Sequence, residues 1–456
     1  MIQKSETWRL LILSRNGREI LFKSPGLGFQ LPRIAIPARQ RIAAGIVSGV
    51  AKQLGLRVVA LYEVFPRDHS DGCGDYYHAA VSHSAQNALC GMRWMPIQSI
   101  SEAHFQGEDA LAFEAFWSKL QETTNHCPSE PFAGLGWFAE VSDWISSSLQ
   151  THSMVLTGAF RQCNASSTFS LIQFETNRRP VWFKAVGQPN IREYAVTLAL
   201  ADICPQHLPK VIASKPSWHA WLSEEAAGTS LAMTTCAKPW QSAAESLANL
   251  QFLARSQENL LCKSGVRDLR AGQLLARAPQ FFACMTACRL AAGQSAEEEL
   301  HKMDLSALHD VVSGALTELE GLCIPDTIGH MDLNPQNIFC SGSDSIFLDW
   351  AESFVGCPFF SFEYLLQHFR RTHFADCLTE AQLREAYLGR WRNLLSAEVI
   401  RGALQLVPLT ALFSYAVTLC PDSVRSHLPS PTQRRYLFQL LRRMNRMSRS
   451  AMEVCG

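Results

Sequence analysis

One stretch of the chain carries the side-chain types that transfer of a phosphoryl group would require. His330 stands two residues before Asp332, and Asn337 follows five residues after that aspartate. The apolar segment Ile346–Leu348 then leads directly into Asp349. A transferred phosphoryl group spreads negative charge over its oxygens, so a catalyst must orient the acceptor hydroxyl and hold a divalent cation against the phosphates. Carboxylate and amide oxygens suit Mg²⁺, and the spacing therefore predicts a phosphotransfer site rather than an ordinary turn before a strand.

This stretch, with the Asp-Trp pair that follows the apolar segment, resembles the catalytic loop of the aminoglycoside phosphotransferase family, a branch of the protein-kinase-like superfamily. The resemblance implies that Asp332 is the catalytic base or orients the acceptor, and that His330 braces the loop. It also implies that Asn337 and Asp349 bind Mg²⁺, that ATP or alternatively GTP donates the phosphoryl group, and that a hydroxyl of a small polar molecule accepts it. The family usually has glycine where this chain has Met331, a middle position to which we assign no chemistry.

Two charged residues upstream fit the same interpretation. Lys184 lies in the strand-like segment Val181–Val186, and Glu193 lies near the start of a helix expected from Ile191. In kinase-like folds a lysine on the third strand contacts the nucleotide phosphates and pairs with a helix glutamate. We therefore expect Lys184 and Glu193 to form that pair. The alternative for each is a solvated surface residue.

A loop that covers the phosphates should lie between the first two strands of this region. The segment Arg161–Ser167 occupies that place but lacks a glycine-rich pattern. Small polar residues can still present backbone N–H groups and hydroxyls to a phosphate. The candidates for this role are Asn164, Ser166 and Ser167. A plain hairpin loop is the alternative.

The surrounding pattern predicts an α+β fold with a bilobal, protein-kinase-like phosphotransferase domain. Residues 151–225 are expected to form a small lobe with an antiparallel sheet, and residues 226–456 a large, mainly helical lobe. The segment Trp221–Gly228 resembles the family's hinge between the lobes. The most apolar stretch, Ala403–Cys420, is short for a membrane span and contains polar residues and a proline. We therefore expect a buried core helix there and no membrane span.

The N-terminal part is expected to form a separate small α/β domain at 1–105, followed by a helical connector at 106–150. Two short strands flank the turn Arg15–Gly17, and a helix at 39–54 ends at Gly55. The stretch Ile46–Leu56 resembles the helix of a Nudix hydrolase. In an active Nudix box the helix carries an Arg-Glu pair and two further adjacent glutamates that hold Mg²⁺, and these positions are here Ser48, Gly49, Lys52 and Gln53. Because a lysine would repel the metal ion, the resemblance implies a degenerate, non-hydrolytic Nudix-like domain. An unrelated small α/β domain is the alternative.

Charge and cysteine usage restrict the partners and the compartment. The 456 residues contain 41 Lys+Arg and 41 Asp+Glu, which indicates neither nucleic acid nor an anionic membrane as a partner. The arginine-rich tail, Arg434–Arg449, is expected to be the solvated face of a terminal helix. Fifteen cysteines lack metal-type spacing, and the polar segment Met1–Arg9 lacks the apolar core of a secretory signal. These features predict reduced, mostly buried thiols in a cytoplasmic protein; the oligomeric state is left open.

Two classes of function follow from these residues. The first is an ATP-dependent kinase acting on a small hydroxyl compound. The second is a nucleotide-binding pseudokinase or regulatory module, favoured by the unusual phosphate loop and by an N-terminal domain that could serve for docking. A Nudix pyrophosphatase is disfavoured because its metal-binding carboxylates are missing. A cationic acceptor would require carboxylates in the large lobe, for which Glu352 and Glu363 are candidates, with surface or helix-capping roles as the alternative.

Overall fold

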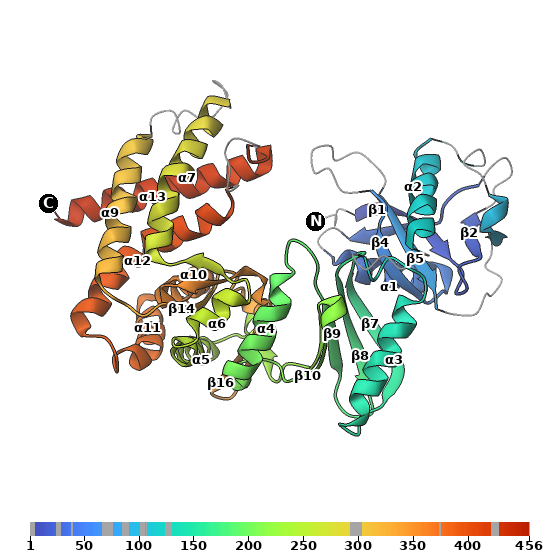
Figure 1. The fold of residues 1–456 in the computed structure, drawn as a ribbon, viewed down its shortest axis with the longest axis horizontal. Helices are drawn as coiled ribbons and strands as arrows, with labels where there is room; N and C mark the ends of the chain where they lie inside the picture. Colours follow the sequence, from blue (N-terminus) through green and yellow to red (C-terminus); the bar gives the residue numbers. More distant parts are fainter. Residues whose placement is uncertain are drawn as a thin grey trace. The chain divides into compact units, whose positions relative to one another are not determined.

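The chain divides into two compact units in a computed structural model (Figure 1). Unit 1 comprises Met1–Tyr194 and Lys210–Glu225, and unit 2 comprises Ala195–Pro209 and Ala226–Gly456. The structure describes residues 5–23, 29–37, 40–65, 76–83, 91–100, 105, 107–123, 130–291, 303–373, 375–420 and 428–455.

Unit 1 begins with a mixed six-stranded sheet. Its order is β4-β5-β1-β2-β6, and β3 pairs with the N-terminal part of β1. Strands β1 and β5 run parallel, and the other pairs are antiparallel. The bounds are β1 (Ser5–Leu13), β2 (Glu19–Lys23), β3 (Arg33–Pro37), α1 (Ile42–Leu54), β4 (Val58–Glu63), β5 (Tyr76–Ser82) and β6 (Met92–Pro96).

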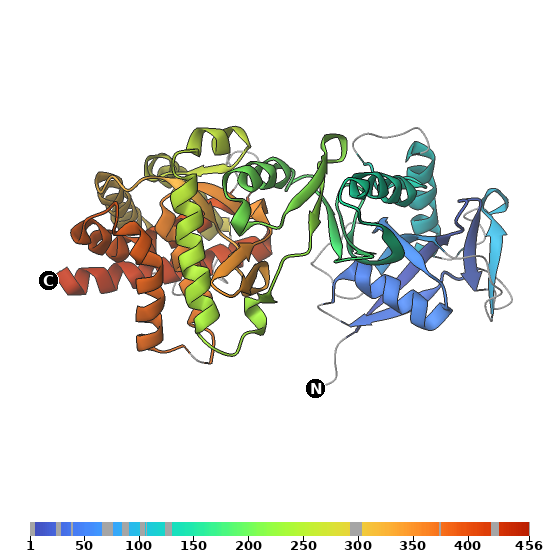
Figure 2. The same cartoon turned by 90° about the horizontal axis from the view of Figure 1, so that it is seen from below.

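The alternation of apolar residues along β1 explains why helices cover both faces of this sheet. Leu10 and Ile12 share a core cluster with α1, whereas Leu11 and Leu13 belong to the cluster that contains α2 (Glu108–Thr123). Successive side chains of a strand point to opposite faces. The two views of unit 1 accordingly show α1 and α2 on opposite sides of the sheet (Figures 1 and 2).

A second, wholly antiparallel sheet follows helix α3 (Trp137–Gln150). Its order is β10-β11-β9-β8-β7. Its strands are β7 (Leu156–Ala165), β8 (Ser170–Thr176), β9 (Val181–Ala185), β10 (Val211–Lys215) and β11 (Ala220–Glu224). The sequence predicts a small antiparallel sheet in this region, and the structure shows that the sheet has five strands.

The two sheets of unit 1 share one hydrophobic core. The cluster that begins with Leu11 and Leu13 continues through α2 and α3 to Phe183 and Leu222 of the second sheet. A side chain also links the sheets, because the amide of Gln162 in β7 donates to the carbonyl of Ala60 in β4 at 2.9 Å and accepts from its N–H at 2.8 Å. The N-terminal region therefore packs against the small sheet. The domain boundaries at 105 and 150 stay predictions.

Unit 2 is mainly helical and contains two three-stranded sheets, ordered β12-β15-β16 and β13-β17-β14. Its strands are β12 (Thr229–Ser230), β13 (Arg267–Leu269), β14 (Thr327–His330), β15 (Ile338–Ser341), β16 (Asp344–Phe347) and β17 (Ser353–Gly356). Its longer helices are α5 (Lys238–Ala254), α6 (Glu258–Lys263), α7 (Ala271–Ala291), α9 (Leu305–Gly321), α10 (Pro358–Phe369), α11 (Cys377–Trp391), α12 (Ala397–Thr418) and α13 (Pro431–Cys455). Helix α4 (Arg192–Ile203) begins in unit 1 and ends in unit 2.

Helix α12 corresponds to the most apolar stretch of the sequence. Among the described helices it is the one long and apolar enough to cross a membrane, and 56% of its most apolar window is buried in the protein. Its buried residues, among them Phe413 and Ala416, belong to the large core of unit 2. This is the packing expected of a core helix; the absence of a membrane span stays a prediction.

The mixed α+β class is confirmed, and so are most of the predicted elements. The hairpin around Arg15–Gly17 forms, with Leu13 opposite Ile20, and α1 ends at Gly55 with a positive φ of 65°. The Nudix-like identity of this region stays a prediction. The ten described cysteines are all free, but two of them are exposed and three are partly buried, so burial is less general than expected. Within the expected helical connector, residues 124–129 lie outside the described residues.

Candidate active site

Four short strands of unit 2 bring together the residues of the predicted site. Asp332 follows β14, and Asn337 immediately precedes β15. The hairpin β15–β16 pairs Ile338 with Phe347, and the N–H of Leu348 donates to the carbonyl of Asn337 at 2.8 Å. Asn337 and Asp349 therefore lie at the same open end of this hairpin. Strand β14, which precedes Asp332, pairs antiparallel with β17, which follows Asp349 in the chain.

His330 holds these segments to one another. Its Nε2 lies 3.0 Å from the carbonyl of Leu348, and its Nδ1 accepts from the N–H of Asp332 at 3.1 Å. These two contacts fix the Nε2–H tautomer, with Nδ1 as the acceptor. Burial lowers the pKa of His330 and outweighs the opposing effects of its bond to Leu348 and of nearby carboxylates. A neutral imidazole thus joins the loop of Asp332 to the strand end that carries Asp349, which makes His330 a positioning residue.

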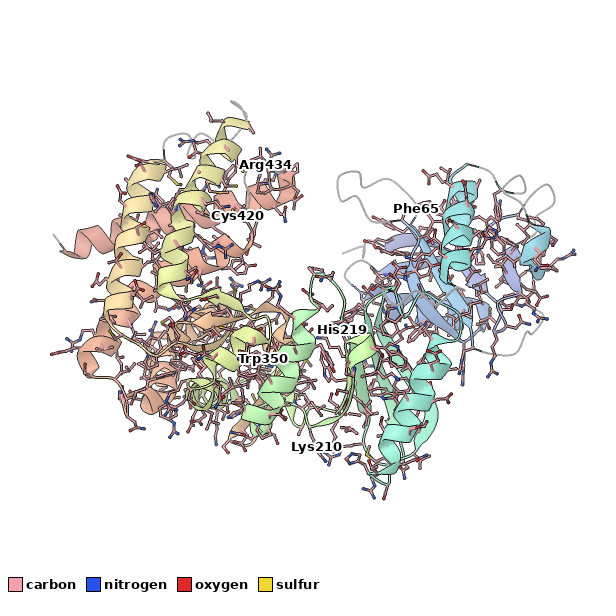
Figure 3. All side chains as sticks on the ribbon, viewed as in Figure 1. Phe65, Lys210, His219, Trp350, Cys420 and Arg434 are labelled. Atoms are coloured by element: carbon pink, nitrogen blue, oxygen red, sulfur yellow. The ribbon has the colours of Figure 1, made fainter. Side chains whose placement is uncertain are left out.

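The ring of His330 packs tightly, which supports this positioning role. It lies 4.8 Å from the ring of Trp350, whose position in unit 2 is labelled in Figure 3. Gly329, the residue before it, pairs with Phe354 across the sheet. A Cβ at Gly329 would lie 2.1 Å from the ring of Phe354, so glycine is required where β14 approaches β17.

Asp332 and Asn337 are joined directly. The Nδ2 of Asn337 donates to the carboxylate of Asp332 at 3.3 Å and to its carbonyl at 3.2 Å. Asp332 itself is exposed. Among the described residues, the Oδ1 of Asn337 has no hydrogen-bond partner. The carboxylate is thus oriented by one side of the amide, while the amide oxygen stays available to a ligand.

Asp349 adopts a left-handed backbone conformation, with φ 66° and ψ 61°. For residues other than glycine such a conformation costs roughly 1–3 kcal/mol, and it occurs preferentially at functional sites. The short helix Trp350–Glu352 begins directly after it, and the N–H of Met331 donates to the carbonyl of Glu352 at 3.1 Å. The backbone thereby turns between β16 and β17 with the exposed carboxylate of Asp349 at the turn.

The donor set at this end of the hairpin fits Mg²⁺. Asn337 offers an amide oxygen and Asp349 a carboxylate, and both are at least partly exposed. Mg²⁺ is commonly held by one or two protein oxygen ligands, together with substrate phosphates and water. No group of three or more His, Cys, Asp or Glu side chains suited to a metal occurs among the described residues, so a metal here would depend on the phosphates for its remaining ligands.

Lys184 and Glu193 form an ion pair in unit 1. The Nζ of Lys184 lies 2.5 Å from the Oε1 of Glu193, and the two side chains are 15% and 2% exposed. Lys184 is in the middle of the sheet, opposite Leu171 of β8 and Trp221 of β11. Glu193 lies in the first turn of α4, where a negative charge favours the helix dipole. The sequence therefore predicted this contact correctly, while its role toward a nucleotide stays a prediction.

Replacing Glu193 with glutamine tests the cost of breaking this pair. We expect Glu193→Gln to lower the free energy of unfolding by roughly 3 kcal/mol, because it removes the negative charge that lies 2.5 Å from a poorly exposed ammonium group. Glu224→Gln is the matched control in the same unit, since Glu224 pairs with the exposed residues Arg179 and Lys210. The control should lose less than about 1 kcal/mol in chemical denaturation. Equal losses of unfolding free energy in the two variants would contradict the larger contribution expected of the Lys184–Glu193 pair.

The expected phosphate loop differs from the one that the structure shows. Strand β7 continues through Asn164, which pairs with Leu171 after a register shift in β7, so the turn contains only residues 166–169. The hydroxyl of Ser166 accepts from the N–H groups of residues 168 and 169, and Ser167 donates to Glu130 at 2.9 Å. Placing Asn164 in a loop was therefore wrong. Both serine hydroxyls already have partners within the protein, and their role toward a phosphate stays a prediction.

A cavity of about 550 Å³ has Asp332 and Met331 in its wall. Residues that the sequence did not single out, from α10 and the turn after it, from α12 and from α13, complete the wall; they include His368, Arg371, Tyr415 and Tyr436. No local pattern marks them, because they meet only when three helices pack together. Arg443, expected on a solvated helix face, also lines the cavity and donates to Gln367 at 3.0 Å, which corrects the interpretation of the tail at that residue.

The two carboxylates proposed for a cationic acceptor have other partners. Glu352 lines the cavity but forms an ion pair with Arg267. Glu363 is 4% exposed and lies 3.1 Å from Arg370. Glu363 therefore serves the packing of α10 rather than the cavity wall.

Among known proteins, this chain is similar only to solved structures, and not to a family model or a curated sequence. No family model matches the chain, and no curated protein matches it. Among solved structures, a macrolide 2'-phosphotransferase from Brachybacterium faecium is 16% identical, with a TM-score of 0.40, and the match covers 62% of this chain and 95% of that one. A choline/ethanolamine kinase family protein from Mesorhizobium loti is 14% identical over 69% and 98% of the two chains, with a TM-score of 0.42. A choline kinase from Cryptosporidium parvum is 12% identical over 68% and 96%, with a TM-score of 0.47.

Proposed function

We propose that this protein is an aminoglycoside-phosphotransferase-like kinase, which transfers the γ-phosphoryl group of ATP to a hydroxyl of a small molecule in a Mg²⁺-dependent reaction. The observation that carries the proposal is the network around His330. A neutral histidine fixes the backbone of Asp332 and the strand end before Asp349, while Asn337 orients the carboxylate of Asp332. An ordinary turn would not require a buried histidine with both ring nitrogens engaged.

Each residue then has a defined role in the reaction. Asp332 accepts the proton of the acceptor hydroxyl as the hydroxyl oxygen forms a bond to the γ-phosphorus. The bond from that phosphorus to the bridging oxygen breaks, and ADP leaves with the electron pair. Asn337 and Asp349 would hold Mg²⁺, which neutralises charge on the phosphates. Lys184, held by Glu193, would contact the phosphates of the nucleotide.

A pseudokinase is the second candidate, and one observation favours it. The turn at residues 166–169 uses its serine hydroxyls and several of its N–H groups internally, which leaves fewer donors for a phosphate. Such a protein would bind a nucleotide without transferring its phosphoryl group, and its N-terminal region would serve as a docking surface.

A thermal-shift titration with Mg·ATP, followed by an assay of ADP release with a panel of hydroxyl compounds, separates the two functions. A kinase should be stabilised by Mg·ATP and should release ADP only when a suitable acceptor is present. The same titration with Mg·GTP tests the alternative donor. Stabilisation without ADP release from any acceptor would favour the pseudokinase, and the absence of stabilisation by either nucleotide would contradict both.

A further inference from the structure

The cavity beside Asp332 indicates the charge of the acceptor, on the premise that the proposed function is correct. Because Asp332 would take the proton of the acceptor hydroxyl, the acceptor must lie in this cavity. The wall contains three guanidinium groups and two carboxylates, from Arg267, Arg371, Arg443, Asp332 and Glu352. The charge that the acceptor meets depends on which of these groups neutralise one another.

The carboxylates of the wall are poorly suited to a cationic acceptor. Glu352 is neutralised by Arg267, with which it forms an ion pair. Asp332 accepts a hydrogen bond from the neutral amide of Asn337, which leaves its negative charge in place, and as the proposed base it faces the acceptor hydroxyl. Asp332 is therefore the one carboxylate without an ion pair in the described part of the wall, and its single negative charge stands against the guanidinium groups of Arg371 and Arg443.

Arg443 is held in the wall by a neutral group. The Oε1 of Gln367 accepts from its guanidinium at 3.0 Å. Gln367 is oriented in turn by Glu363, which accepts from its Nε2 at 3.4 Å and is itself paired with Arg370. The chain of contacts thus fixes the position of Arg443 while the charge of Glu363 is balanced by Arg370. Among the described residues Arg443 therefore forms no ion pair, and its remaining donors are available to the cavity.

Arg371 adds a second positive charge to the same wall. In the part of the chain that the structure describes, its side chain forms no ion pair or hydrogen bond. The neighbouring cavity residue His368 does not offset this charge, because burial and the proximity of Arg371 lower the pKa of the imidazole against the opposing effect of Asp332. His368 is therefore neutral near pH 7, and the cavity has two guanidinium groups without a carboxylate partner.

The rest of the wall combines aromatic and aliphatic side chains with a few polar ones. It contains three tyrosines and three leucines: Tyr364, Tyr415, Tyr436, Leu412, Leu419 and Leu440. The hydroxyl of Tyr364 is already satisfied by the carbonyl of Ala411 and by Ser414. Aromatic rings can also bind quaternary ammonium groups. In the described part of the wall, however, Arg371 and Arg443 outnumber the one carboxylate without an ion pair, Asp332, and the resulting net positive charge would repel such a cation.

We propose that the acceptor is an anionic hydroxyl compound with an apolar body. Its carboxylate or phosphate group binds Arg443 and Arg371, as expected for planar guanidinium donors. Its apolar part packs against the tyrosines and leucines, and its hydroxyl reaches Asp332. Amines and quaternary ammonium alcohols are thereby disfavoured as acceptors.

Equilibrium binding without nucleotide tests this proposal independently of catalysis. The probes are phenyl-substituted alcohols that share one body and carry a carboxylate, a phosphate ester, a primary amide or a trimethylammonium group. By isothermal titration, at least one anionic probe should bind roughly tenfold or more tightly than the amide, and the ammonium probe should bind most weakly. The ranking of carboxylate against phosphate shows which anion the wall prefers.

Substitution of the two arginines tests whether they cause the preference for anionic probes. The double variant Arg371→Gln/Arg443→Gln should lose the preference for the anion and keep its affinity for the amide, whereas Arg443→Lys should retain most of the preference. Arg435→Gln is the control, because Arg435 lies on the same helix but is exposed and outside the cavity. The proposal is overturned if the ammonium or amide probe binds as tightly as the anions, if no anionic probe binds at millimolar concentration, or if Arg435→Gln has the same effect as the double variant.

The same measurements distinguish failure of this proposal from failure of the proposed function. Asp332→Asn should lower phosphoryl transfer about a thousandfold but keep the anion preference or strengthen it, because it removes a negative charge from the wall. Transfer to a cationic alcohol by the wild-type protein would disprove the anionic acceptor and uphold the kinase. Anion binding that depends on the two arginines, in a protein without phosphoryl transfer, would uphold the cavity's charge preference and contradict the kinase.

Discussion

Replacing Asp332 with asparagine is expected to lower kcat for phosphoryl transfer by about a thousandfold, because removal of a general base costs roughly 10²–10⁴ in rate. The substitution keeps the shape of the side chain, and its amide oxygen can still accept from the Nδ2 of Asn337. Asp332 is exposed, so its replacement should change the midpoint of thermal unfolding by only a degree or two. The measurement is steady-state ADP release in the presence of a hydroxyl acceptor.

Asp344→Asn provides the control for this variant. Asp344 is an exposed aspartate at the start of β16, in the same unit and outside the cavity wall. Its replacement should leave kcat within about twofold of wild type, as expected of surface substitutions. An Asp332→Asn enzyme with wild-type kcat would show that Asp332 is not the base.

Replacing Asp349 with asparagine is expected to lower kcat by at least about a hundredfold, comparable with the loss of one preorganised electrostatic contact to a transition state. It should also raise the Mg²⁺ concentration required for half-maximal rate, because a carboxylate ligand becomes a neutral amide. Asparagine is the appropriate replacement, since it tolerates the left-handed backbone conformation better than most residues. The measurement is the dependence of the ADP-release rate on Mg²⁺ concentration.

Asp349→Ala serves as the comparison for backbone strain. Alanine lacks both the ligand and the tolerance for positive φ, so Asp349→Ala should lose more stability than Asp349→Asn by roughly 1 kcal/mol, while both lose activity. If Asp349→Asn kept the Mg²⁺ dependence of the wild type, the proposed role of Asp349 in metal binding would be wrong.

The parts of the site that the sequence predicts are those determined by nearby residues. His330, Asp332 and Asn337 lie within one short loop, and the apolar strand that follows it brings Asp349 back beside Asn337 through a hairpin. Lys184 and Glu193 are nine residues apart, at the end of one strand and the start of the next helix. In each case the local pattern of strand, turn and helix is sufficient to bring the side chains together.

The features that the sequence does not predict depend on contacts between distant segments. Gln162 bonds to Ala60, 102 residues away, and this joins the N-terminal sheet to the small sheet. Arg443 and Gln367 are 76 residues apart, and nothing around Arg443 distinguishes it from the other arginines of the tail. The turn at residues 166–169 was placed too early because a register shift in β7 lets polar residues stay in the strand.

The most direct test of the central claim is ³¹P NMR of the wild-type protein with ATP, Mg²⁺ and a panel of hydroxyl compounds that includes anionic alcohols. The proposed kinase should produce ADP together with a new phosphate ester, in equal amounts, and chelation of Mg²⁺ or the Asp332→Asn substitution should stop both. A wild-type protein that binds Mg·ATP but forms no phosphate ester with any compound, or one that forms the ester equally well with Asp332→Asn, would contradict the account.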